Sequence, residues 1–147
     1  MWWWKSNYIR QYLLAMRKRN TRSKLPKVKE LKKLHAKLWK IFSEYVRRKA
    51  QGRCYICHST HDWRETDASH YLHGRLDYSE TNVKACCRKC NRFMHGNLGL
   101  YAERLINDYG RNVLVELRQE AAQIKKWTIE ELEAKIKEYK KKLSQLT

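Results

Sequence analysis

The sequence predicts an α+β fold that is mostly helical, with a small cysteine-stapled core between long basic N-terminal helices and a C-terminal heptad helix. Charged residues make up 33% of the 147-residue chain, which has five glycines and one proline, a balance typical of long solvated helices. Two Cys-x2-Cys pairs bracket a segment with weak β character, and the tail carries a regular apolar repeat. We therefore expect a basic helical arm over residues 1–50, a core over residues 51–110 and C-terminal helices over residues 111–147.

Apolar periodicity predicts the helices. After Pro26, apolar residues spaced by three and four predict an amphipathic helix of about 24 residues with a lysine-rich opposite face. Its apolar positions are Leu31, Leu34, Leu38, Ile41 and Tyr45. A second helix is expected from Arg88 to about Asp108, ended by Gly110, and a third over residues 112–126.

The tail predicts one more helix. Thr128 and Glu131 match a capping box, with Thr128 as the N-cap. An apolar stripe then follows the a and d positions of a heptad repeat. Its members are Ile129, Leu132, Ile136, Tyr139, Leu143 and Leu146. This stripe is expected to pack either on the helix around residues 31–45 of the same chain or on a second copy, so a homodimer stays open.

Four of the five cysteines stand in two pairs, Cys54 with Cys57 and Cys87 with Cys90. Each pair is typical of a knuckle, a tight turn that aims two thiolates at one point, and two knuckles supply the four sulfurs of a tetrahedral structural Zn²⁺ site. Zinc in a reducing compartment explains the pairs better than disulfides do. The fifth cysteine, Cys86, is expected to be a small buried side chain beside the second knuckle.

The net charge of +18 is unevenly placed. The first 53 residues hold 17 lysines and arginines against two acidic residues, whereas residues 54–110 hold seven of each. A basic arm beside a neutral segment is typical of a protein that grips a polyanion, and nucleic acid is the expected partner because neutralising phosphates releases counterions. The candidate DNA-binding residues are Arg17, Lys18, Arg19, Arg47, Arg48 and Lys49, with His73 as a further phosphate or metal contact.

Three tryptophans, Trp2, Trp3 and Trp4, leave alternatives open at the N-terminus. Their rings can stack on bases, pack internally or rest on an anionic membrane surface. The triplet is too short for a secretory segment, and no stretch approaches the roughly 18 apolar residues that span a bilayer. We therefore expect DNA rather than a membrane as the partner, and a cytoplasmic location.

The segment between the knuckles carries the polar residues suited to hydrolysis. The expected strands are Thr60–Tyr71 and Thr81–Ala85. In and after them stand Asp67, His70, Asn82, Asn91 and His95. If a helix continues through Asn91, then His95 shares its face and becomes a candidate metal or phosphate contact. A zinc site would hold the frame of these side chains rigid.

Taken in order, these motifs resemble those of known nucleases. Cys54-x2-Cys57, Asp67-Ala68-Ser69-His70, Asn82 and Cys87-x2-Cys90-Asn91 are similar to the HNH nucleases, which use a ββα-metal fold. A closer resemblance, from about Tyr45 to Leu146, is to the phage NinG/Rap recombination endonucleases. The matching segments are Asp67–Tyr71, Glu80–Val83, Cys87–Asn91, Gly96–Leu98, Trp127–Glu131 and Lys137–Tyr139.

The resemblance implies metal-dependent cutting of branched DNA, such as Holliday junctions and displacement loops, in the host cytoplasm if the chain is phage-encoded. It makes His70 the general base, a role that suits an imidazole. It makes Asn82 the residue that holds the hairpin and orients His70 by hydrogen bonding. Asn91 matches a position that binds the catalytic divalent ion, which would be Mg²⁺ or Mn²⁺.

One departure bears on the chemistry. Ser69 stands where HNH sites commonly carry Asp or His, so Asp67 is expected to take over as the metal ligand. The alternative is a non-catalytic, zinc-containing accessory protein that binds junction DNA without cutting it. A third reading is an assembly protein that works through its tail helix.

Overall fold

The computed structural model describes residues 27–74, 76–123 and 126–146. Arg17, Lys18, Arg19 and the Trp2–Trp4 triplet therefore lie outside the described residues. A long helix, here called the first helix, covers residues 27–49 and leads into the first knuckle. The elements that follow are η1 (Trp63–Glu65), β1 (Thr66–His70), β2 (Val83–Cys87), the short π-type turn η2 (Lys89–Phe93), α2 (Leu98–Tyr109), α3 (Val113–Ala122) and α4 (Ile129–Ser144).

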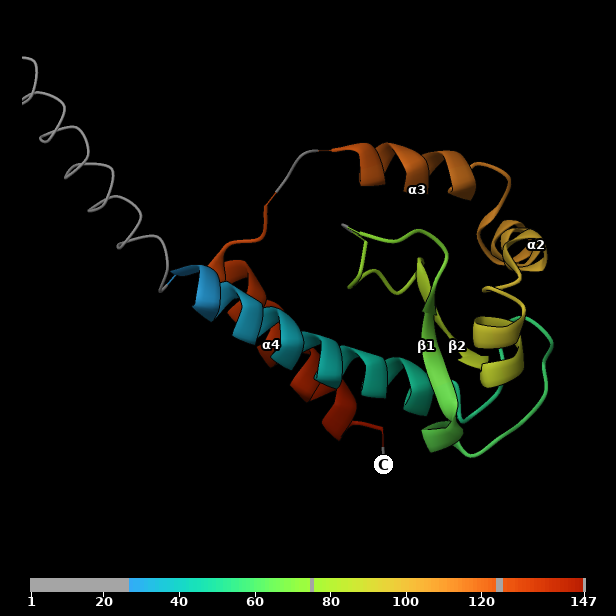
Figure 1. Ribbon diagram of the computed structural model, residues 1–147, viewed down its shortest axis with the longest axis horizontal. Helices are drawn as coiled ribbons and strands as arrows, with labels where there is room; N and C mark the ends of the chain where they lie inside the picture. The colour runs from blue at the N-terminus through green and yellow to red at the C-terminus, as the bar shows by residue number, and fades with distance from the viewer. Residues whose placement is uncertain (1–26, 75, 124–125, 147) are drawn as a thin grey trace, which may run out of the picture.

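The first helix and α4 lie side by side and run in the same direction (Figure 1). Arg48, near the end of the first helix, donates a hydrogen bond to the carbonyl oxygen of Leu146, just beyond α4. The two helices and the hairpin form what we call the helical core. Its buried members are Leu38, Phe42, Tyr45, Val46, Tyr78, Val83, Ala85, Leu132, Ile136 and Tyr139. The expectation that the tail stripe packs on its own chain is confirmed, and Thr128 with Glu131 forms the expected capping box.

A second buried cluster, the cysteine core, joins the knuckles to α2 and α3. Its members are Cys54, Ile56, Leu76, Cys86, Cys87, Cys90, Tyr101, Leu105, Val113 and Leu117. Cys86 is fully buried beside the second knuckle, as expected. No helix among the described residues is long and apolar enough to cross a membrane.

The two-stranded hairpin separates the two cores and contributes side chains to both. β1 and β2 pair in antiparallel fashion, with Thr66 opposite Cys87 and His70 opposite Val83. Because side chains alternate along a strand, Val83 and Ala85 enter the helical core while Cys86 enters the cysteine core. In Figure 1 the hairpin lies between the first helix with α4 on one side and α2 on the other.

Three expectations about the elements were wrong in part. The second strand covers Val83–Cys87 rather than Thr81–Ala85. The first strand starts at Thr66 rather than Thr60, because the Asp62 side chain accepts a hydrogen bond from the Arg64 backbone N–H and caps η1 instead. The helix expected from Arg88 to Asp108 is broken between η2 and α2. There His95, Gly96 and Asn97 have φ values of 49°, 81° and 43°, so the chain turns out of the helix.

Candidate metal centre and hydrolytic site

Four cysteine sulfurs meet at the end of the hairpin. One Sγ atom from each of Cys54, Cys57, Cys87 and Cys90 lies within 4.8 Å of the others, and the Cys57 and Cys87 sulfurs are 3.7 Å apart. In a tetrahedral zinc–thiolate site with Zn–S bonds of about 2.3 Å, the sulfurs are about 3.8 Å from one another. The four cysteines therefore fit a structural metal ion such as zinc, as the sequence predicted.

Local backbone geometry builds the first knuckle. The Cys54 N–H donates to Ser59 O (2.8 Å) and the His58 N–H to Cys54 O (3.0 Å), with His58 in the left-handed region at φ 61°. A Cβ at Gly52, where φ is 75°, would collide with the His61 carbonyl oxygen, so only glycine fits there. The Tyr55 N–H donates to Ala85 O and ties the knuckle to β2.

The surroundings of the sulfurs shift their pKa values in both directions, and burial raises the pKa of Cys90. A hydrogen bond from the buried Cys86 thiol lowers the pKa of Cys54, which favours the thiolate that metals bind. Ser59 Oγ lies 3.0 Å from Cys57 Sγ and 2.8 Å from His61 Nε2. Such outer contacts orient metal ligands. Sequence reasoning missed this chain of contacts, although Ser59 and His61 stand within four residues of Cys57.

His70 ends β1 and faces the first helix. Its ring stacks on Trp39, with centroids 4.9 Å apart, and lies 5.3 Å from the ring of His73. Its Nε2 is 3.3 Å from Asp77 Oδ1, but the atom is buried and makes no hydrogen bond within the described residues. The imidazole is therefore held on one face by an indole and has a carboxylate beside it. Sequence reasoning gave no role to Trp39 or Asp77 at this site.

Asn82 is fully buried at the start of β2 and fixes the loop between the strands. Its Oδ1 accepts from the Leu72 N–H (2.8 Å), and its Nδ2 donates to Leu72 O (2.8 Å) and Leu76 O (3.2 Å). The expected hydrogen bond to His70 is absent among these, because the amide is already used by the loop backbone. Asn82 therefore fixes the loop that follows His70 and makes none of these bonds to His70 itself.

Tyr101 of α2 contacts both ends of the same loop. Its buried hydroxyl lies 3.1 Å from both the Ser69 and the Asn82 carbonyl oxygens, at the two ends of the loop. Nothing in the local sequence marks this contact, because α2 and the hairpin are separated by the second knuckle. The structure thus couples the end of β1 to the cysteine core through one tyrosine.

Asp67 lies on the other face of β1, turned toward η2. The Arg92 guanidinium donates to both carboxylate oxygens (2.8 Å each), and Asn91 Nδ2 donates to Oδ2 (3.1 Å). The Arg92 hydrogen bonds lower the pKa of Asp67. These residues border a hollow of about 300 Å³ at the edge of β1, between η2 and the first helix. Trp39 lines this hollow and also stacks on His70, so it joins the two groups.

The oxygens of Asp67 and Asn91 are of the type that Mg²⁺ uses, and Mg²⁺ usually takes one or two protein carboxylates with waters and phosphates. In this structure, however, Arg92 donates to both carboxylate oxygens and the Asn91 amide nitrogen also donates to one of them. Within the described residues, the cysteines are the one cluster of three or more metal-ligating Cys, His, Asp or Glu side chains. His95 is not on the Asn91 face, because the chain leaves the helix at His95 itself.

Among the basic candidates, Arg47 and Arg48 surround an aromatic ring together with Arg64. Their guanidinium carbons lie 5.4, 5.5 and 4.6 Å from the Trp63 ring centroid. Lys49 is instead paired with Glu80 at 2.7 Å. His73 is exposed beside His70. The cluster of Arg47 and Arg48 thus extends onto η1 through Trp63 and Arg64, two residues that sequence reasoning did not single out.

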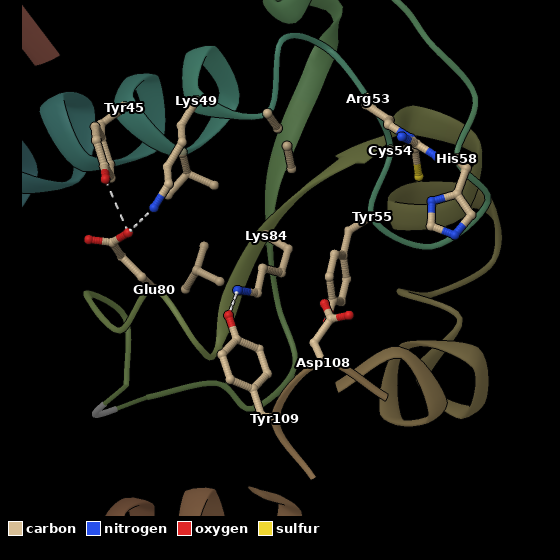
Figure 2. A pocket seen from close by; sticks show the side chains of 14 residues that line it. Tyr45, Lys49, Arg53, Cys54, Tyr55, His58, Glu80, Lys84, Asp108 and Tyr109 are labelled. Carbon is tan, nitrogen blue, oxygen red and sulfur yellow. Dashed lines mark hydrogen bonds and ion pairs between the residues drawn. The ribbon is translucent and has the colours of Figure 1, made fainter. Parts of the chain in front are cut away.

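A further cavity of about 460 Å³ lies along β2, with Lys49 and the knuckle residue Cys54 among its lining residues (Figure 2). Its charged and phenolic groups largely pair with one another: Lys49 with Glu80, Tyr55 with Asp108, and Lys84 with Tyr109. His70, Asp67, Asn82 and Asn91 are not among its lining residues. This cavity is therefore separate from the candidate hydrolytic groups.

Fold and site define a mixed, mainly helical protein with a small two-stranded sheet and a four-cysteine site suited to a metal ion. The family described as "Bacteriophage Lambda NinG protein" matches residues 7–147, and the chain belongs to this family. "Protein ninG" of Escherichia phage lambda is 34% identical over 84 residues, which cover 54% of this chain and 41% of that protein. The chain thus spans less than half the length of that relative. No solved structure matches.

Proposed function

We propose that this chain is a metal-dependent endonuclease that nicks branched DNA recombination intermediates such as Holliday junctions and displacement loops, through an HNH-type ββα-metal core made of β1, β2 and η2. The observation that carries the proposal is His70, whose buried Nε2 makes no hydrogen bond within the described residues, at the end of a strand whose following loop is locked by Asn82. An imidazole nitrogen without a hydrogen-bond partner keeps its lone pair free, as a general base needs, and the proposal includes an opening of the site that admits the attacking water.

In this proposal each residue has a distinct task. His70 takes the proton of the attacking water, and Asp77 stabilises the imidazolium from 3.3 Å. Trp39 holds the ring plane by stacking. Asp67 and Asn91 would hold Mg²⁺ or Mn²⁺, which would neutralise charge on the scissile phosphate. Arg92 then exchanges its carboxylate partner for a phosphate oxygen.

The basic surface is proposed to hold the DNA. Arg47 lies at the edge of the hollow beside Asp67 and also over Trp63, so a strand leaving the site would meet the cluster of arginines around that indole. Paired cuts on a four-way junction need two active sites, so the active species is proposed to be a homodimer. Such an enzyme would work in the cytoplasm of the infected cell.

A second candidate function has its own observation. Asp67 is held at both oxygens by Arg92, and the buried Ser69 stands where a metal ligand is common in HNH sites. If Arg92 does not release Asp67, the same surface would bind junction DNA without cutting it. The chain would then be a zinc-containing recombination accessory protein.

A cleavage assay separates the two. A labelled four-way junction and a linear duplex of the same sequence are incubated with the wild-type protein or His70→Ala, with Mg²⁺, Mn²⁺ or no added divalent ion. The nuclease proposal expects ion-dependent nicks in the junction, weak cutting of duplex, and loss of at least about 100-fold in rate for His70→Ala with binding retained. Junction binding without cleavage under every ion would establish the accessory function instead.

A further inference from the structure

Phe93 is the most exposed large apolar side chain among the described residues. It ends η2 with 79% of its surface accessible, and the adjacent Met94 is 43% accessible. The other phenylalanine of the chain, Phe42, is fully buried. Phe93 and Met94 are consecutive and both exposed, so a partner that covers the two side chains together would gain the free energy of their burial.

The backbone under Phe93 is rigidly held rather than loose. Cys90, three residues earlier, belongs to the four-cysteine cluster. The Met94 N–H donates to Lys89 O (3.0 Å), and the Gly96 N–H lies 3.0 Å from both Cys90 O and Asn91 O. Asn97 N–H closes the turn on Met94 O (2.8 Å). The backbone that carries the Phe93 ring is thus fixed by these hydrogen bonds before any ligand binds.

The surroundings of Phe93 favour a polyanion. Residues 88–98 contain Arg88, Lys89 and Arg92 and no acidic residue. Arg88 and Lys89 are exposed and form no ion pair within the described part of the chain. An apolar ring near two unpaired cations, Arg88 and Lys89, is charge-complementary to stacked bases flanked by phosphates, because the ring meets the bases while the cations meet the backbone.

Phe93 is also close to the proposed chemistry. Asn91 and Arg92, just before it, both contact Asp67 at the edge of β1. A base stacked on Phe93 would therefore place the neighbouring phosphates near this hollow. Bases at a branch point are stacked on one side only or easily unstacked, so a wedge costs less free energy there than inside a duplex.

We propose that Phe93, with Met94, is a wedge that inserts against the bases at a DNA branch point while Arg88, Lys89 and Arg92 hold the adjacent phosphates. The proposal rests on the proposed function in one respect, that branched DNA is the ligand. It adds a residue that selects branches over duplex, a property that the His70 site alone does not provide.

The test uses a four-way junction carrying 2-aminopurine at the branch, whose fluorescence rises when the base loses its neighbours. All proteins carry His70→Ala so that binding is read without cutting. The parent is expected to raise the fluorescence, and Phe93→Ala to abolish the rise and weaken junction binding about 10-fold, with duplex binding unchanged. Phe93→Trp is expected to restore both the fluorescence rise and the junction affinity. The control Val115→Ala shortens an apolar side chain of 51% exposure on α3 and is expected to change neither quantity.

Equal fluorescence and affinity for the parent and Phe93→Ala would overturn the wedge, and so would failure to bind the junction. A monomer–dimer equilibrium in sedimentation that Phe93→Ala abolishes, with the fluorescence unchanged, would assign the ring to a second copy and also overturn it. The proposed nuclease fails separately: if the protein with His70 intact cuts nothing while the fluorescence rise persists, the wedge stands and catalysis does not.

Discussion

The helical core and the cysteine core share one hairpin but are held together by different physics. In the helical core, large side chains such as Phe42, Tyr139 and Leu132 are buried against one another. In the cysteine core, four of the ten buried members are cysteines, and three of those four belong to the metal-binding cluster. The comparison teaches that the helical core is stabilised by packing, whereas the cysteine core combines apolar packing with a four-cysteine cluster that fits a metal ion.

The largest expected effect follows from removing the metal site. Because structural zinc contributes on the order of 10 kcal/mol to small metal-held folds, Cys87→Ser should abolish zinc binding and expose the amides of α2 and α3 to hydrogen exchange. The first helix and α4 should keep most of their protection. Zinc content by atomic absorption and hydrogen-exchange mass spectrometry measure the two quantities.

Cys86→Ala is the matched control for the metal site. Cys86 is buried next to Cys87 but is not part of the four-cysteine cluster. The variant removes the hydrogen bond from Cys86 to Cys54 but none of the four sulfurs, so it should retain one zinc per chain and lose only about 1 kcal/mol through the small cavity. Loss of zinc from both variants would show that Cys86 takes part in metal binding, which contradicts the assignment of the four ligands.

The next largest effect concerns the two phenylalanines. Phe42 is fully buried and packs edge-on against Tyr139, with centroids 4.8 Å apart. Phe42→Ala should lower the free energy of unfolding by about 3–5 kcal/mol. Phe93→Ala should change it by less than about 0.5 kcal/mol, because that ring is already in solvent. Urea unfolding followed by circular dichroism measures the free energy of unfolding of both variants. Similar losses for the two would contradict the contrast between a buried Phe42 and an exposed Phe93.

Sequence and structure agree best where a signal is local. The apolar spacing of the first helix, the Thr128 cap and the Cys-x2-Cys pairs are each contained within a few residues, so periodicity and spacing were enough to predict the two helices and the metal cluster. The likeness to NinG was also correct, because it rested on several short segments in fixed order.

The sequence predicted less where the determining contact is distant. The helix after Cys87 breaks at His95 because the Gly96 N–H turns back to Cys90 O and Asn91 O, which no helix propensity encodes. Asp67 pairs with Arg92, 25 residues further along the chain, and the His70 ring stacks on Trp39 of the first helix. These pairings depend on how the hairpin is clamped between the two cores, and so they appear only in three dimensions.

A smaller effect comes from Glu80, which ties the first helix to α4. Its carboxylate contacts Lys49 Nζ at 2.7 Å and Lys142 Nζ at 2.9 Å and accepts from the Tyr45 hydroxyl at 3.1 Å. Burial alone would raise the pKa of Glu80, but the hydrogen bonds from both lysines outweigh it and lower the pKa to about 2, from an ordinary 4.5. Since the folded-state pKa is depressed, the stabilisation is complete above pH 4.5 and is lost as the pH falls toward 2.

Glu80→Gln should therefore cost about 2 kcal/mol at pH 7, and the difference from the wild type should shrink as the pH falls below about 4.5. Urea midpoints measured across this pH range test both statements. Glu138→Gln is the control, because Glu138 pairs with Lys142 on the surface of the same helix and should cost only about 0.3 kcal/mol. A constant difference between Glu80→Gln and the wild type down to pH 2 would contradict the role of the Glu80 charge.

The smallest effect tests whether the two cores respond separately. Thr128 Oγ1 accepts from the Glu131 N–H at 3.2 Å, and the Glu131 side chain accepts from the Thr128 N–H at 3.0 Å, so these two backbone donors at the start of α4 are satisfied. Thr128→Ala should cost about 1 kcal/mol, and Thr128→Ser should recover most of it. Because α4 packs in the helical core and not in the cysteine core, hydrogen exchange should quicken in the first helix and α4 while the amides of α2 keep their rates. An equal increase in α2 would mean that the two cores unfold as one cooperative unit through the shared hairpin. The helical core and the cysteine core would then differ in the interactions that stabilise them but not in the free energy at which they open.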